Sequence, residues 1–326
     1  MRKIFINFIL FCCTILIINF FFLIYFKFFF KQKFISQKML RLFPVEKSFL
    51  YHDTYNSLEN YNLILGDSHV FGIGDSLLNQ DYNYSIGHQL YLLTKKKDNF
   101  INVGIPGAGS KISYFYAENF IKKKKGNLKR ILFVFYEGND LTDNINFKKN
   151  KNKKIKLKLR IFLESYFPIY HIFKNSRHIL FGKKEKKQIN LQTPAMELDV
   201  QNIELSIKIF FDTILKLKNF SENISIAYIP SPATVYSKNS TYAETLMGKN
   251  NHIYSKSDIQ LRSKQIREKI KKFCKNNNIL FLDTTETLNI NSTKKNIYGP
   301  KDLDHPNKYG YELISGYIYK NFNFDN

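Results

Sequence analysis

Five short apolar runs, separated by longer amphipathic stretches, constrain the fold of this chain more than any other feature. The runs are residues 63–65, 100–103, 131–135, 224–229 and 279–282. Strands that are apolar along their whole length are typical of a parallel sheet covered by helices on both faces. The clearest helix is expected over residues 258–274, where apolar side chains recur on one face. The sequence therefore predicts an α/β fold with a parallel sheet of about five strands.

The first 41 residues differ from the rest and are predicted to be a membrane anchor with a juxtamembrane linker. Residues 4–26 carry no charged side chain, and as a helix they would span roughly 34 Å, enough to cross a bilayer. A cleavable signal peptide is the alternative, but the run contains no Ala or Gly for a small-x-small cleavage site. We therefore predict one transmembrane helix over residues 4–26 and one folded domain over residues 42–326.

Residues 141–200 interrupt the alternation of strands and helices. Two basic runs, residues 148–160 and 183–187, lie on either side of a stretch rich in aromatic residues. About sixty residues are few for an independent second domain. We interpret this region as an insertion in the folded domain, expected to form a helical cap over the sheet edge.

The net charge of +23 suggests a nucleic-acid partner, but the residue types argue against one. Only seven of the 50 basic residues are Arg, whereas phosphate-binding surfaces favour the bidentate Arg fork. Abundant Asn, Ile, Phe and Tyr point instead to an AT-rich coding bias. We interpret the lysines as solvated surface residues and predict no nucleic-acid partner.

Polar and glycine-rich segments follow the first three expected strands and precede the last helix. They are Gly66-Asp67-Ser68, Asn102–Gly109, Gly138-Asn139-Asp140 and Asp302–His305. Parallel sheets place ligand sites just past the carboxyl ends of their strands. A serine on a tight turn, nearby amide donors and a histidine with a carboxylate are the parts that nucleophilic acyl transfer needs. Each segment alone would also fit an ordinary turn or helix cap.

Taken together, these four blocks resemble the SGNH (GDSL-like) hydrolase superfamily over residues 61–320. The resemblance implies a flavodoxin-like three-layer sandwich and a catalytic triad of Ser68, His305 and Asp302. It also implies an oxyanion hole made by the backbone N–H groups of Ser68 and Gly107 and the side chain of Asn139. No cofactor is expected, and because the remaining histidines lack metal-ligand spacing, no metal is predicted either.

Two positions near these blocks leave alternatives open. His69 follows the candidate nucleophile, and we expect it to be a helix-entry residue rather than a second polar group of the site. Asp304 competes with Asp302 for the carboxylate that orients His305. We favour Asp302, since the spacing of three residues is the usual one in the similar family.

The predicted activity is that of a serine esterase. The same triad would serve an O-acyltransferase that uses a sugar hydroxyl in place of water, and a non-catalytic membrane-anchored scaffold is a further alternative. Residues 136–141 and 229–232 resemble segments of SGNH proteins associated with bacterial envelope polysaccharides, so acylated carbohydrates are the expected substrates.

The charges around the predicted anchor leave its orientation open. Five basic residues between Lys27 and Arg41 favour the cytoplasm for the C-terminal side. A short tail carrying Arg2 and Lys3 would ordinarily stay inside instead. Because envelope glycans are met outside, we expect a single-pass membrane protein with an extracytoplasmic catalytic domain.

Overall fold

The structure is a computed structural model of the 326-residue chain. It describes residues 60–75, 85–95, 97–123, 126–149, 159, 203–237, 246–247, 253–299, 302 and 304–322, together with short pieces between residues 6 and 21. The chain divides into two units, one of residues 1–53 and 154–188 and the other of residues 54–153 and 189–326. All the strands and helices named below belong to the second unit.

Five parallel strands form the central sheet, in the order β2-β1-β3-β4-β7. Their bounds are β1 Asn60–Gly66, β2 Phe100–Gly104, β3 Asn127–Tyr136, β4 Ile224–Ile229 and β7 Leu280–Asp283. By position along the chain this is the order 2-1-3-4-5 of flavodoxin-like sheets. The predicted parallel five-stranded sheet is confirmed, and the last strand lies one residue later than expected.

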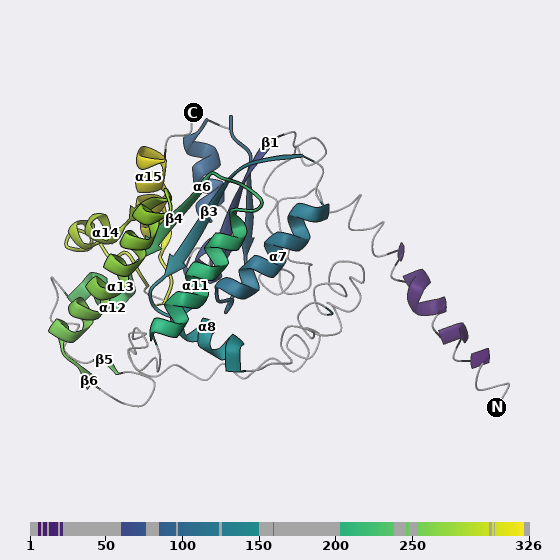
Figure 1. Cartoon of the computed structure of the whole chain (residues 1–326), viewed down its shortest axis with the longest axis horizontal. Coiled ribbons are helices and arrows are strands. Elements are labelled where there is room, and N and C mark those ends of the chain that lie inside the picture. Colours follow the sequence, from purple (N-terminus) through teal and green to yellow (C-terminus); the bar gives the residue numbers. More distant parts are fainter. Residues whose placement is uncertain are drawn as a thin grey trace. The chain divides into compact units, whose positions relative to one another are not determined.

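Helices cover both faces of the sheet, as the uniformly apolar strands require (Figure 1). On one face Phe210 packs against Phe133 and Phe135, with ring centroids 5.3 and 4.9 Å apart. Phe211 of the same helix stacks on Phe273 at 3.9 Å. The helices involved are α7 Ser110–Lys123, α8 Asp140–Lys149, α11 Ile203–Leu217 and α13 Lys256–Asn276. The helix expected over residues 258–274 is therefore present and slightly longer.

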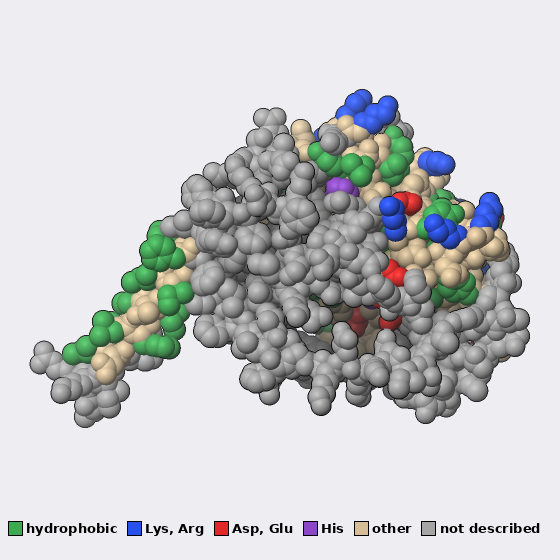
Figure 2. Space-filling model, turned by 180° about the vertical axis from the view of Figure 1, so that it is seen from behind, with side chains coloured by type: hydrophobic (Ala, Val, Ile, Leu, Met, Phe, Trp, Pro, Cys, Tyr) green, Lys and Arg blue, Asp and Glu red, His purple; other side chains and the backbone are tan. Residues whose placement is uncertain are grey.

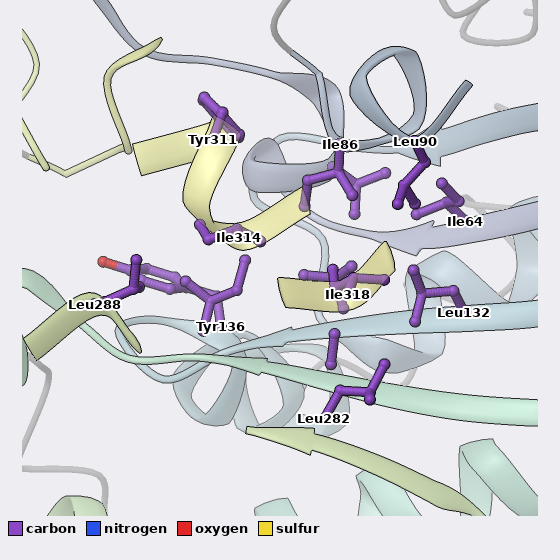
Figure 3. Packing of buried hydrophobic residues seen from close by; sticks show 14 of the residues in the cluster. Ile64, Ile86, Leu90, Leu132, Tyr136, Leu282, Leu288, Tyr311, Ile314 and Ile318 are labelled. Carbon is purple, nitrogen blue, oxygen red and sulfur yellow. The ribbon is translucent and has the colours of Figure 1, made fainter. Parts of the chain in front are cut away.

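The opposite face of the sheet carries a continuous hydrophobic cluster (Figure 3). Because side chains alternate along a strand, Leu132, Val134 and Tyr136 of β3 point to this face. They meet Ile314 and Ile318 of α15. The elements of this layer are α6 Ile86–Leu93, α14 Thr285–Ser292 and α15 Lys308–Asn321.

Four short elements complete the described fold: α4 Ser68–Phe71, α12 Pro232–Ser237, β5 Leu246–Met247 and β6 Ile253–Tyr254. The last two pair as a small antiparallel ribbon. Of the predicted insertion over residues 141–200, only residues 141–149, which belong to α8, and Leu159 are described. The remainder of that prediction lies outside the described residues.

The predicted membrane anchor falls mostly on residues of the first unit that the structure describes only in pieces. The described residues between 6 and 21 are helical. Within the described part of the chain, no helix combines the length and the apolar character that crossing a bilayer requires. The anchor over residues 4–26 stays a prediction.

Candidate active site

Ser68 comes directly after β1 and is the first residue of α4. Asp67 caps this helix, since its Oδ1 accepts the backbone N–H of His69 at 2.9 Å. Gly66 allows the close approach of strand and helix, because a Cβ there would lie 2.7 Å from Val70 Cγ2 and 2.9 Å from the Val134 carbonyl oxygen. The turn thus places a serine hydroxyl at the carboxyl edge of the sheet.

His305 and Asp302 lie in the loop before α15 and complete a hydrogen-bonded chain with Ser68. His305 Nε2 is 2.8 Å from Ser68 Oγ. His305 Nδ1 is 2.9 Å from each oxygen of the Asp302 carboxylate. The structure therefore brings together the three residues that the sequence proposed as a triad, 237 positions apart in the case of Ser68 and His305.

The Asp302 carboxylate is also held by the backbone of its own loop. Its Oδ1 accepts the N–H of Asp304 at 3.0 Å and that of His305 at 3.2 Å. The Asp304 carboxylate, in contrast, makes no hydrogen bond to any described residue. This geometry favours Asp302 over Asp304 as the carboxylate that orients the imidazole.

The electrostatics of the pair suit a base that becomes an imidazolium. Burial raises the pKa of Asp302, but the hydrogen bond and charge of His305 outweigh it, so the pKa of this carboxyl lies below its ordinary value. Burial lowers the pKa of His305, but Asp302 above all, then Asp67 and Asp304, bring that pKa above its ordinary value. Three carboxylates therefore favour a proton on His305.

Side chains from distant parts of the chain hydrogen-bond to the backbone of the Asp302 loop and of the turn after α4. Asp75 Oδ1 accepts the N–H of Asp302 at 2.7 Å, across 227 positions. The Tyr136 hydroxyl donates to the carbonyl oxygen of Asp304 at 3.3 Å, and the Tyr311 hydroxyl donates to that of Ile73 at 2.6 Å. None of these three residues was predicted from the sequence to belong to the site. Only the position of Asp75, seven residues after Ser68 and next to Gly74, could have suggested a role in the site.

The predicted oxyanion donors follow three adjacent strands, β1, β2 and β3. Gly107 is exposed, has a φ of 71°, and its N–H donates to no described residue. The Asn139 amide makes no hydrogen bond to the described residues either, and its Oδ1 is buried. The N–H of Ser68 lies in the first turn of α4, where a helix has no internal acceptor. All three donors are available at the edge where Ser68 lies, and their role stays a prediction.

Two buried carboxyl groups shape the turn that carries Asn139. Glu137 Oε2 accepts the N–H of Ser231 at 2.8 Å, and Asp140 Oδ2 accepts the N–H of Tyr136 at 2.8 Å. Burial raises the pKa of both, and Asp67 further raises that of Asp140. These bonds hold the residues on either side of Asn139.

The structure places His69 at the start of α4, as expected, and its side chain also contacts residues of the candidate site. Its side chain is fully buried, and its Nδ1 lies 3.1 Å from Asp67 Oδ1. Its ring centroid is 3.7 Å from that of Tyr136 and 4.9 Å from that of His305. The second residue of α4 therefore contacts the ring of the candidate base.

No charge pattern or metal cluster adds a second site to the described part of the chain. Figure 2 shows lysine and arginine side chains at several separate places on the described surface of one face. Among the described residues, no three His, Cys, Asp or Glu side chains are placed to hold a metal ion. His52, His171, His178 and His252 lie outside the described residues.

Comparisons with known proteins find likeness only at the level of structure. No protein-family model matches the sequence, and no curated protein matches it. A member of the lipolytic protein G-D-S-L family from Veillonella parvula DSM 2008 is 13% identical, with a TM-score of 0.42 over 81% of this chain and 99% of that chain.

Two acetyl xylan esterases are similarly distant. The esterase AlAXEase is 15% identical, with a TM-score of 0.41 over 80% of this chain and 98% of that chain. A catalytic mutant of an acetylxylan esterase from Geobacillus stearothermophilus is 12% identical, with a TM-score of 0.43 over 82% and 95%. Similarity this distant assigns neither an activity nor a substrate to this chain.

Proposed function

We propose that this protein is a serine esterase of the SGNH type that acts through Ser68, His305 and Asp302. The observation that carries the proposal is the continuous contact from Asp302 through the His305 ring to Ser68 Oγ, at 2.9 and 2.8 Å. Distances in this range let a base take the hydroxyl proton as the oxygen attacks.

The reaction follows from this contact in two steps. Ser68 Oγ attacks the acyl carbon of an ester while its proton passes to His305 Nε2, and the imidazolium then protonates the leaving alkoxide. The acyl group stays on Ser68 until water, deprotonated by His305, releases it as an acid. The N–H groups of Ser68 and Gly107 and the Asn139 amide would hold the oxyanion in both steps.

An O-acyltransferase is the second candidate for the same site. A sugar hydroxyl in place of water would receive the acyl group from Ser68, with His305 again removing the proton. The resemblance of residues 136–141 and 229–232 to segments of SGNH proteins linked to envelope polysaccharides supports a carbohydrate ester or acceptor. The apolar run over residues 4–26 supports a location at the membrane. Because the proposed substrates are envelope carbohydrates, we propose that the catalytic domain is extracytoplasmic.

A labelling experiment separates the enzyme from a non-catalytic scaffold. A fluorophosphonate probe reacts only with an activated serine, so it should label the full-length protein and fail on the Ser68→Ala variant. Equal labelling of both proteins, or none of either, would contradict the proposed function. Release of p-nitrophenol from p-nitrophenyl acetate, with and without a sugar acceptor, then separates esterase from transferase, because only a transferase speeds up with the acceptor.

The proposed topology has its own test. Alkaline phosphatase fused after residue 326 becomes active only when exported, so the fusion should be active in cells. An inactive phosphatase, with a fluorescent green fluorescent protein at the same site, would place the domain in the cytoplasm.

A further inference from the structure

A second carboxylate–imidazole pair lies directly behind the candidate nucleophile. Asp67 and His69 flank Ser68 in the sequence, and both side chains are fully buried. Asp67 Oδ1 accepts from the backbone N–H of His69 at 2.9 Å and contacts its ring Nδ1 at 3.1 Å. The pair is thus closed on itself by two hydrogen bonds.

Both members of this pair also touch the proposed triad. Asp67 Oδ2 accepts a hydrogen bond from Ser68 Oγ at 3.3 Å. The His69 ring also contacts the rings of Tyr136 and His305, with centroids 3.7 and 4.9 Å away. The pair therefore contacts the proposed nucleophile through Asp67 and the ring of the proposed base through His69.

We propose that Asp67 and His69 are positioning residues, a buried pair that holds the His305 ring against Ser68 and gives the Ser68 hydroxyl a second acceptor. The inference rests on the function proposed above and adds two residues that the triad does not include. Each member acts through Ser68 or His305 and needs no contact with the substrate.

The second acceptor matters because the Ser68 hydroxyl has a single proton. When His305 is neutral, that proton points to Nε2 at 2.8 Å, and attack can proceed. When His305 carries a proton on Nε2, this N–H donates to Ser68 Oγ, and the Ser68 hydroxyl turns to Asp67 Oδ2. Asp67 thus keeps the nucleophile hydrogen-bonded in the resting, protonated form of the site.

The contact with Asp67 also orients the His69 ring. With Asp67 as acceptor, the ring proton lies on Nδ1. His69 Nε2 is buried and has no partner among the described residues. The His69 ring is buried, is hydrogen-bonded at Nδ1 and contacts two other rings. These contacts suit a residue that positions its neighbours better than one that transfers a proton.

The charge of Asp67 affects the pKa of His305, so the proposal can be tested through the pH dependence of activity. The titratable groups that the described residues place around His305 are Asp302 and Asp304 from its own loop and Asp67 and His69 from the β1–α4 turn. The charge of Asp67 also raises the pKa of Asp140, Tyr136 and Tyr311. Removing the Asp67 charge should therefore ease loss of the proton from His305.

Asp67→Asn is the most informative variant, because it keeps the size of the side chain and an oxygen for His69. Its amide nitrogen replaces the oxygen that faces Ser68. We expect kcat of the full-length protein on p-nitrophenyl acetate to fall about tenfold, with KM within twofold, for the loss of one hydrogen bond to the nucleophile. The acidic limb of the kcat/KM profile should move to a pH lower by about 1. If neither kcat nor the midpoint of the acidic limb of the kcat/KM profile changes, the proposal is overturned.

Two substitutions of His69 separate its ring from its hydrogen bond. His69→Phe keeps a ring beside those of Tyr136 and His305 but cannot donate to Asp67, whereas His69→Asn keeps a donor and removes the ring. We expect each to lower kcat about tenfold at constant KM, and the Asp67→Asn/His69→Phe double variant to lose no more than Asp67→Asn alone. Wild-type kcat in both single variants, or fully additive losses in the double variant, contradicts a pair that acts as a unit.

Controls distinguish this inference from the proposed function and from misfolding. Asp258→Asn makes the same chemical change at the exposed start of α13 and should leave kcat and the profile unaltered. Thermal unfolding shows which variants fold, and if Asp67→Asn does not, the His69 variants carry the test. If the wild-type protein shows no Ser68-dependent fluorophosphonate labelling, the proposed function fails. If labelling is present and the variants behave as wild type, only the pair is wrong.

Discussion

The two carboxylate–imidazole pairs of this molecule have the same chemistry and different surroundings. In the Asp302–His305 pair the two side chains are 17% and 16% exposed, and both ring nitrogens of His305 have partners. In the Asp67–His69 pair they are 0% and 1% exposed, and only one ring nitrogen of His69 has a partner among the described residues. A base must pass its proton to a substrate oxygen, so it needs both a held nitrogen and an accessible one.

Under the proposed mechanism, burial and the partner of the second ring nitrogen distinguish the base, His305, from the positioning residue, His69. His305 has Asp302 on one nitrogen and the nucleophile on the other, at the rim of the sheet. His69 contacts two other rings, and its second nitrogen faces no described donor or acceptor. Exchanging histidine for another residue should therefore have unequal effects at the two positions.

The largest effect is expected from Ser68→Ala, which removes the proposed nucleophile, a residue that contacts one member of each pair. Turnover of p-nitrophenyl acetate should fall by about 10⁶, the scale seen when a catalytic serine is removed. The hydroxyl makes two hydrogen bonds and little packing contact, so the free energy of unfolding should change by only about 1 kcal/mol. Activity above a few per cent in a protein that unfolds at the wild-type temperature would refute the assignment of the nucleophile.

Asp302→Asn should have the next largest effect and should exceed the effect of Asp67→Asn. An amide at this position can donate to His305 Nδ1, which would leave the proton on Nε2 and block its role as base. In a triad this tautomer change costs about 10⁴ in kcat. Steady-state kinetics of the two variants side by side give the comparison. A greater loss in Asp67→Asn would make the buried pair the principal one.

Asn139→Ala tests the proposed oxyanion hole, which involves neither pair. Loss of one oxyanion donor costs about 10² to 10³ in kcat, with little change in KM. The Asn139 amide makes no hydrogen bond to the described residues, so its loss should hardly change thermal stability. A kcat within a factor of three of wild type would remove Asn139 from the oxyanion hole.

Much of this arrangement could be predicted from the sequence because it depends on local patterns. Runs such as residues 131–135 are apolar at every position, which only a strand covered on both faces tolerates. Ser68, Gly107 and Asn139 could be placed at one edge because parallel strands end at the same edge. Asp302 could be chosen from its spacing to His305, and the structure places it in contact.

What could not be predicted depends on contacts between residues far apart in the chain. No pattern within the sequence connects Asp75 to the N–H of Asp302 or Tyr136 to the backbone of Asp304. The ring contacts of His69 with Tyr136 and His305 could not be predicted either. Those contacts exist only once β3, α4 and the last loop have packed together.

The smallest expected effect concerns Asp304, the carboxylate that the sequence left as a rival to Asp302. Since the pKa of His305 lies above its ordinary value, the acidic limb of the wild-type kcat/KM profile should have its midpoint above about pH 6.5. His305 works as a base only when neutral, so activity rises as pH passes upward through this midpoint. Asp304 contributes to the raised pKa through its charge, after Asp302 and Asp67, and without a hydrogen bond to the ring.

Asp304→Asn should therefore move the midpoint slightly to lower pH and leave the plateau at high pH within about twofold of wild type, as expected for a charge that acts at a distance through solvent. Asp302→Asn, in contrast, should lower the plateau itself. Measuring kcat/KM from pH 5 to 9 for both variants separates a change in midpoint from a change in plateau. A collapse of the plateau in Asp304→Asn, with Asp302→Asn near wild type, would transfer the orienting role to Asp304 and leave the Asp302 contact without a catalytic purpose.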